Sequence, residues 1–178
     1  MNTILTTGIA ITFAISTACT SGTTTNNASE HESHEQESTA PETGNPQFKD
    51  EKSKAVYQHY IHLKTALVNS DAKEAQAGAA ALKTALSNAG NKKGADLAAK
   101  IATSEDIKTQ RNGFDALTSE VEGFIKTAGL KSGKIYKQYC PMAKDGNGAY
   151  WLASESDIKN PYYGDEMLSC GEVKEEIK

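Results

Sequence analysis

Several residue types and motifs are scarce or missing in this sequence, and each absence excludes a class of function. No Lys or Arg occurs before Lys49, and nowhere does a basic stripe or an interleaving of basic and aromatic residues appear, which excludes nucleic-acid binding. There is no Gly-rich phosphate loop, no H-E-x-x-H and no G-x-S-x-G motif. A Cys-x-x-Cys redox motif is also missing. We therefore expect a protein that is not an enzyme.

The charge is distributed unevenly. Residues 20–47 are almost entirely Thr, Ser, Asn, Glu, Gln, Pro and Gly, and their charged side chains are all acidic, whereas all 19 basic residues follow them. Such a segment cannot bury enough apolar surface to offset its conformational entropy. We expect residues 19–48 to form a disordered acidic tether, in which His31 and His34 belong to a solvated polar run rather than to a metal site.

The first residues have the pattern of an export signal. Residues 4–18 carry no charge and are apolar or small, but this stretch is too short for a permanent membrane-spanning helix. It predicts a signal peptide over residues 1–18. Cys19 follows Thr17-Ala18 as in a bacterial lipobox, so we expect it to be lipidated and to anchor the protein to a membrane of the bacterial cell envelope, facing the periplasm or the cell surface.

The next part of the chain shows helical periodicity. Val56, Tyr60, Leu63 and Leu67 form one apolar stripe, and an Ala-rich face follows in the next segment. Ser104 is a suitable N-cap for the third long helix. We expect helices at residues 49–69, 71–89 and 107–128 with a short helical connection at 91–103, and these segments predict an antiparallel three- or four-helix bundle over residues 49–129.

Gly and Pro become frequent after Gly129, so residues 130–175 predict a loop-rich cap with a short β-hairpin at 149–152. The fold class we expect is mainly α, with one domain over residues 49–175. Arg111, in the middle of the last helix, is a candidate to hold a carboxylate of the cap in a bidentate pair.

The cap concentrates sulfur in two near-mirror motifs, Cys140-x-Met142 and Met167-x-x-Cys170. Thiolates and thioethers are soft ligands that select Cu(I) and similar ions, so these four residues are candidate metal ligands. The alternative is a Cys140–Cys170 disulfide, which would contribute about 3 kcal/mol by closing a loop of this length. The residues alone leave both interpretations open, and the redox state of the two Cys residues can connect them.

Two further groups are candidates for the same region. His59 flanks the apolar stripe of the first helix and is a candidate fifth ligand if the cap folds over that helix, whereas His62 lies on the polar side. The cap also contains the single Trp of the chain. Its aromatic residues form either a docking surface or simply the core of the cap; they are Tyr150, Trp151, Tyr162 and Tyr163.

These motifs together resemble the DUF3347 family of envelope proteins, over about residues 50–175. The resembling segments are Tyr57-x-x-Tyr60-x-x-Leu63, Arg111-x-x-Phe114, Tyr139-Cys-Pro-Met-Ala143, Gly148-Ala-Tyr-Trp-Leu152 and Asn160-Pro-Tyr-Tyr-Gly164. The family is of unknown function. Its domains occur in small lipoproteins or appended to periplasmic adaptor subunits of heavy-metal efflux systems. The resemblance therefore implies a metal-related role, and we expect an efflux adaptor or another envelope protein as partner.

From the residues and the resemblance together we expect an envelope lipoprotein that binds or hands over a soft metal ion of the Cu(I) or Ag(I) type in association with heavy-metal efflux. The alternative is a structural or protein-docking lipoprotein whose cap is braced by the Cys140–Cys170 disulfide.

Overall fold

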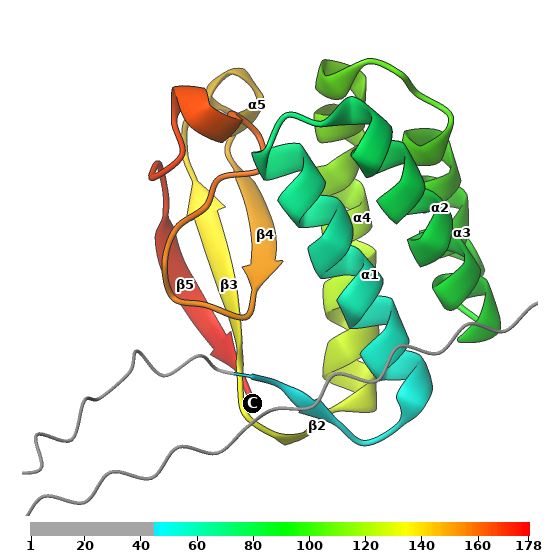
Figure 1. The fold of residues 1–178 in the computed structure, drawn as a ribbon. Helices are drawn as coiled ribbons and strands as arrows, with labels where there is room; N and C mark the ends of the chain where they lie inside the picture. Colours follow the sequence, from blue (N-terminus) through cyan, green and yellow to red (C-terminus); the bar gives the residue numbers. More distant parts are fainter. Residues whose placement is uncertain (1–44) are drawn as a thin grey trace, which may run out of the picture. The chain divides into compact units, whose positions relative to one another are not determined.

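The computed structural model describes residues 45–178, which contain four long helices and a small antiparallel sheet (Figure 1). The helices are α1 (Glu51–Val68), α2 (Ala72–Asn88), α3 (Lys92–Ala102) and α4 (Ile107–Ala128). Helix α1 packs against α2 and α4, and α3 packs against α2 and α4. The mainly helical class expected from the sequence is therefore confirmed.

Each long helix begins at a side chain that caps it. Asp50, Asp71, Asn91 and Asp106 each accept a hydrogen bond from the backbone N–H three residues further on. These bonds satisfy donors that have no partner inside a helix. The expectation that Ser104 caps the last helix was wrong, because Asp106 lies next to the first turn and binds both the backbone N–H and the hydroxyl of Thr109.

The apolar stripes lie where their spacing predicts. Val56, Tyr60, Leu63 and Leu67 of α1 are completely buried, as are the small and apolar residues that line one face of α2. A Cβ atom on Gly78 of α2 would lie 3.1 Å from the backbone of Leu63, so the two helices approach closely. Helix α4 is one continuous helix over residues 107–128, as expected from the sequence.

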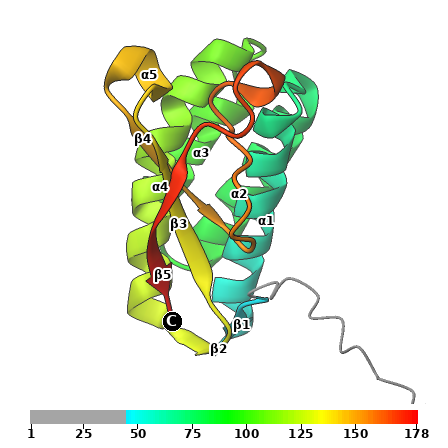
Figure 2. The same ribbon diagram turned by 90° about the vertical axis from the view of Figure 1, so that its left-hand side faces the viewer.

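Residues 130–178 contain more regular structure than the expected loop-rich cap. Strands β3 (Ile135–Cys140), β4 (Ala149–Ala153) and β5 (Glu172–Ile177) form an antiparallel sheet in the order β4-β3-β5, beside the helices (Figures 1 and 2). The expected hairpin within 149–152 was wrong, since this segment is a single strand paired with β3. Two short elements follow β3 and precede β5: α5 (Ala143–Gly146) and the 3-10 helix η1 (Gly164–Glu166).

The fold extends slightly beyond the expected limits of 49 and 175. Strand β1 (Gln47–Phe48) pairs with β2 (Leu130–Ser132), and β5 ends at Ile177, whose side chain is buried. The polar sequence of β5 explains why it was missed: its residues up to Glu176 are exposed and carry no alternation of apolar and polar side chains.

Buried polar contacts join the sheet to the helices. The Tyr60 hydroxyl accepts a hydrogen bond from the backbone N–H of Leu152 at 3.0 Å and bonds to the Thr118 hydroxyl at 2.8 Å. Lys64, which is 2% exposed, donates to Glu155 at 2.7 Å, just after β4. The sheet is thereby fixed against α1 and α4. The two cysteines of the described residues lie where β3 ends and just before β5 begins.

Candidate functional site

The structure brings the thiols of Cys140 and Cys170 together, and we call them the thiol pair. Cys140 is the last residue of β3, and Cys170 lies just before β5, which runs antiparallel to β3 with Tyr139 opposite Glu172. The two ends of these strands therefore meet. Both thiols are free; Cys140 is completely buried and Cys170 is half-buried.

The surroundings of the thiol pair favour the protonated form of Cys170. A hydrogen bond with the Cys140 thiol raises the pKa of Cys170 above its ordinary value, and burial raises it further, because both favour the neutral thiol of Cys170 over its thiolate. The backbone N–H of Met142 opposes this shift by donating to the Cys170 sulfur.

Asn160 holds the chain segment that carries Cys170. Its side chain is completely buried, and its amide nitrogen donates to the carbonyl oxygen of Cys170 at 3.0 Å. Its backbone N–H donates to Leu168, and its backbone carbonyl accepts from Gly164. In the sequence Asn160 stood out only as part of the Asn160–Gly164 segment that carries the family resemblance; its bracing role depends on contacts that no local motif encodes.

Both methionines of the candidate ligand set lie next to the thiol pair, and the contacts that place them there are made by backbone atoms. The carbonyl oxygen of Met167 accepts a hydrogen bond from the backbone N–H of Cys170 at 3.0 Å. Met142 contacts Cys170 through its N–H, while its side chain is 53% exposed. The two thioethers are thus on segments adjacent to the thiols.

His59, the fifth candidate ligand, lies on α1 at a distance from this group. It is half-buried and precedes Val68, the last residue of α1, by roughly two and a half helical turns. It is the far end of α1, at Val68, that contacts η1. His62 is exposed and bonds to Glu74 on α2. The structure therefore does not bring His59 together with the sulfur residues.

The four aromatic candidates separate into buried and accessible residues. Trp151 is completely buried, and its indole N–H donates to the Gln138 side chain at 2.6 Å. Tyr162 is also buried, and its hydroxyl donates to the carbonyl of Tyr150. Trp151 and Tyr162 therefore belong to the core, and only Tyr150 and Tyr163 remain available to a partner.

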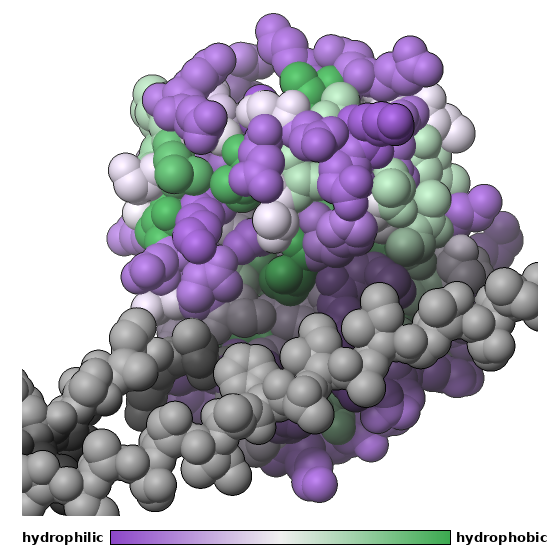
Figure 3. Space-filling model, in the orientation of Figure 1, coloured by the Kyte–Doolittle hydropathy of each residue, from purple (hydrophilic) through white to green (hydrophobic). Residues whose placement is uncertain are grey.

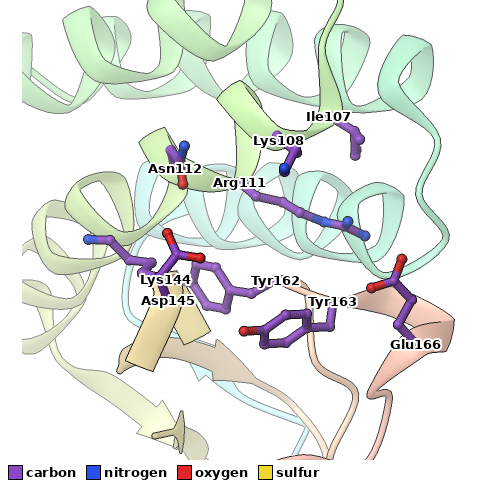
Figure 4. A pocket seen from close by; sticks show the side chains of 9 residues that line it. All are labelled: Ile107, Lys108, Arg111, Asn112, Lys144, Asp145, Tyr162, Tyr163 and Glu166. Carbon is purple, nitrogen blue, oxygen red and sulfur yellow. The ribbon is translucent and has the colours of Figure 1, made fainter. Parts of the chain in front are cut away.

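Tyr163 links the thiol pair to a neighbouring cleft. Its hydroxyl donates to the carbonyl oxygen of Met142 at 2.5 Å. Burial and then the nearby thiols of Cys140 and Cys170 and the carboxylate of Asp145 raise the pKa of Tyr163, so the phenol stays neutral. Its ring also lines a cleft of about 710 Å³ between the first turns of α4, α5 and η1 (Figure 4).

Arg111, on the α4 side of this cleft, has a different role from the expected carboxylate pair. Its Nε donates to the carbonyl of Pro161, and its Nη2 donates to the carbonyl of Leu67 and the hydroxyl of Ser70. The bidentate pair was wrong because these neutral acceptors, at the end of α1 and in the loop before η1, already occupy the guanidinium. Arg111 thus joins three segments of the chain.

The α5 turn has an unusual backbone that the sequence did not signal. Lys144 and Asp145 have φ values of 54° and 58°, a left-handed conformation that costs a residue with a Cβ atom roughly 1 kcal/mol or more. An ion pair between Lys144 and Asp115 of α4, at 2.7 Å, helps to hold this turn. The turn directs Asp145 into the wall of the cleft (Figure 4).

Comparison with known proteins finds one family model that matches the helical part of the chain. Residues 56–133 match the model of a family described as a protein of unknown function, DUF3347. The match supports the resemblance to the DUF3347 family that the sequence motifs indicated. No curated protein and no solved structure matches this chain.

The DUF3347 match extends from α1 to the turn after β2, so it covers the helices that support the sheet. The thiol pair, Tyr163 and most of the cleft wall opposite α4 lie beyond residue 133. The family description names no activity, metal or partner. The chemistry at this end of the molecule must therefore be argued from its own residues.

Some expectations concern residues outside the described range. Residues 1–44 carry the expected signal peptide over 1–18 and the expected lipidation at Cys19. They also carry most of the tether expected over residues 19–48, including His31 and His34. Within residues 45–178, no helix has the length and apolar composition needed to cross a membrane.

Proposed function

We propose that this protein binds one soft monovalent ion, Cu(I) or Ag(I), through the thiol pair, as an envelope lipoprotein associated with heavy-metal efflux. The observation that carries the proposal is the contact between the Cys140 and Cys170 thiols at the meeting strand ends. Thiolate ligands select soft ions, and two of them satisfy an ion that accepts low coordination.

The proposal assigns the remaining parts of the molecule as follows. The helices form an antiparallel bundle that holds the sheet, and the sheet presents the thiol pair at one end. Met142 and Met167 supply additional thioether ligands when their side chains turn toward the thiols. No group is assigned a catalytic role, and Cys19 is the lipid anchor of the mature protein.

Proton release gives the proposal a definite pH dependence. Cys170 has a raised pKa, so it is protonated near neutral pH, and an ion must displace its proton to bind. The apparent affinity for Cu(I) should therefore increase as the pH rises and decrease as the pH falls. Zn(II) should compete poorly, because the described residues contain no group of three or more His, Cys, Asp or Glu side chains suited to it.

The test is a titration of the reduced protein with Cu(I) against a chromophoric chelator. We expect one stoichiometric site that is lost in Cys170→Ser and weakened in Met142→Leu or Met167→Leu. His59→Ala examines the fifth candidate, with His62→Ala as its matched control on the same helix. If the folded, reduced protein takes no Cu(I) from the chelator, metal binding is refuted.

That negative result would favour the second candidate, a docking lipoprotein braced by a Cys140–Cys170 disulfide. It has one observation of its own: among residues 45–178, four large hydrophobic residues are more than a third exposed, and all lie in the sheet or in the segments that connect its strands. They are Met142, Tyr150, Leu168 and Val173. On the face shown in Figure 3, however, hydrophobic areas are separated by hydrophilic side chains, which is ordinary for a protein surface.

The location is tested separately. Intact-mass analysis of protein purified from membranes should show a mature chain that begins at an acylated Cys19. A mature chain with another first residue, or a Cys19→Ala variant that stays on the membrane, would contradict lipid anchoring without affecting the metal-binding proposal.

A further inference from the structure

The cleft beside the thiol pair carries charges of both signs that are not neutralised by contact. Lys108 and Arg111 lie three residues apart on α4 and line one wall. Asp145 of the α5 turn and Glu166 of η1 line the opposite side, with the ring of Tyr163 between them (Figure 4). Among residues 45–178, none of these four side chains forms an ion pair with a charged group.

The wall of the cleft formed by Lys108 and Arg111 can bind an anion. The hydrogen bonds of Arg111 use Nε and Nη2 and go only to neutral oxygens, so its charge has no carboxylate in contact and Nη1 has no acceptor in the described part of the chain. Burial lowers the pKa of Arg111, and only the charge of Glu166 counteracts this effect. A half-buried guanidinium gains more from a carboxylate than a fully hydrated one.

The opposite wall, formed by Asp145 and Glu166, can bind a cation. Lys144 is the one further basic residue that lines the cleft, and it is already paired with Asp115 on α4. It therefore leaves Asp145 and Glu166 as accessible acceptors, and both are exposed. The neutral phenol of Tyr163 provides apolar surface between the two charged walls, and the side chain of Ile107 adds apolar surface on the α4 side (Figure 4).

From this arrangement we propose that the cleft binds a small zwitterion, an amino acid or a short peptide, with its carboxylate at Lys108 and Arg111 and its ammonium group at Asp145 or Glu166. The cleft volume of about 710 Å³ lies within the range of sites that hold small organic ligands. An anion alone would leave the two carboxylates unpaired, and a cation alone would leave the two basic groups unpaired.

The proposal is independent of metal binding, because the zwitterion contacts the cleft and not the thiols. The probe is the dipeptide Gly-Phe, titrated into the intact, reduced, isotopically labelled protein and followed by amide chemical shifts in NMR. We expect saturable binding at or below about 1 mM, with the largest shifts in α4, α5 and η1. Acetylating the amino group or amidating the carboxyl group should each weaken binding about tenfold or more, because each change removes one charged contact.

Variants locate the two ends of the ligand. Lys108→Gln should weaken binding of Gly-Phe and of its acetylated form, whereas Glu166→Gln should weaken binding of Gly-Phe and of its amide. Asp145→Asn is suitable at its position because Asn tolerates a left-handed backbone. Asp165→Asn is the matched control, since Asp165 is an exposed acid of η1 that does not line the cleft, and it should bind like wild type.

Three outcomes would overturn the proposal. One is the absence of saturable binding, and another is equal binding of Gly-Phe and both blocked forms, which would mean apolar contact alone. The third is shifts that map away from α4, α5 and η1. Cys170→Ser should keep its affinity for Gly-Phe, so a failure here is distinguishable from a failure of the metal site.

Discussion

Gly164 is the position where a single added methyl group should most clearly reveal how the end of the molecule with the thiol pair is held. It begins η1, and its φ of 58° is left-handed. A Cβ atom there would lie 2.7 Å from the carbonyl oxygen of Val68, 2.7 Å from the hydroxyl of Ser70 and 2.9 Å from Nη2 of Arg111. The Val68 oxygen belongs to the backbone at the end of α1, and the Arg111 side chain is fixed by three hydrogen bonds. Neither atom can therefore move away easily from an added Cβ atom.

The magnitude for Gly164→Ala follows from two contributions. The left-handed backbone costs an Ala residue about 1 kcal/mol. Crowding in a packed region adds about 1–3 kcal/mol. The free energy of unfolding should therefore decrease by about 2–4 kcal/mol, measured by urea denaturation under reducing conditions.

Gly90 is the matched control for this prediction. Its φ of 82° is also left-handed, but nothing lies within 4 Å of the position of an added Cβ atom. Gly90→Ala should decrease the free energy of unfolding by only about 1 kcal/mol, the conformational cost by itself. If Gly164→Ala loses no more stability than Gly90→Ala, the close packing of η1 against α1 and α4 is refuted.

Two further predictions concern the polar contacts that join the sheet to its surroundings. Burial opposes ionisation of Glu155, but the hydrogen bond and the charge of Lys64 outweigh burial and lower the pKa of Glu155. The Glu155–Lys64 pair therefore stabilises the fold fully at pH values above 4.5, the ordinary pKa of a Glu side chain. The stabilisation is lost as the pH falls through the lowered pKa of Glu155. Glu155→Gln should thus cost about 1–3 kcal/mol at pH 7 in denaturant unfolding, with a difference from wild type that shrinks in acid, whereas the exposed control Glu51→Gln should change stability by less than about 0.5 kcal/mol. Trp151→Phe should lower the unfolding temperature, measured by circular dichroism. The substitution leaves the buried side-chain oxygen of Gln138 without its hydrogen-bond donor, at a cost of about 1–3 kcal/mol. An unchanged unfolding temperature would contradict this role of the indole.

The helical part of this chain could be predicted because its signals are local. The stripe of Val56, Tyr60, Leu63 and Leu67 has the spacing of one helix face, and Asp71 and Gly90 mark the beginning and the end of α2 in the sequence itself. Such signals depend on residues within one or two turns of each other. The same reasoning failed at Ser104, because two neighbouring residues could serve as the cap and only the path of the chain selects Asp106.

The sheet could not be predicted equally well, because its strands are defined by their partners. Strand β5 is exposed and mostly polar up to Glu176, and it becomes a strand because β3 offers it a row of backbone hydrogen bonds. Trp151 and Tyr162 could be read from the sequence as a docking surface or as core. Their burial depends on contacts with Gln138 and Tyr150 across segments that composition does not relate.

The sequence by itself determined which chemistry is available at the end of the molecule: two Cys, two Met and a group of aromatic residues in one short region. It also determined the helices, since capping and periodicity act over a few residues. Only the tertiary structure decided which of these groups meet. Antiparallel pairing of β3 and β5 brings Cys140 to Cys170, and the length of α1 keeps His59 away from them. The packing of η1 and α5 against α4 creates a cleft whose two walls come from residues more than 30 positions apart in the sequence. Contacts across such separations depend on the whole chain being folded, because closing those loops costs entropy that only the complete set of packing interactions offsets.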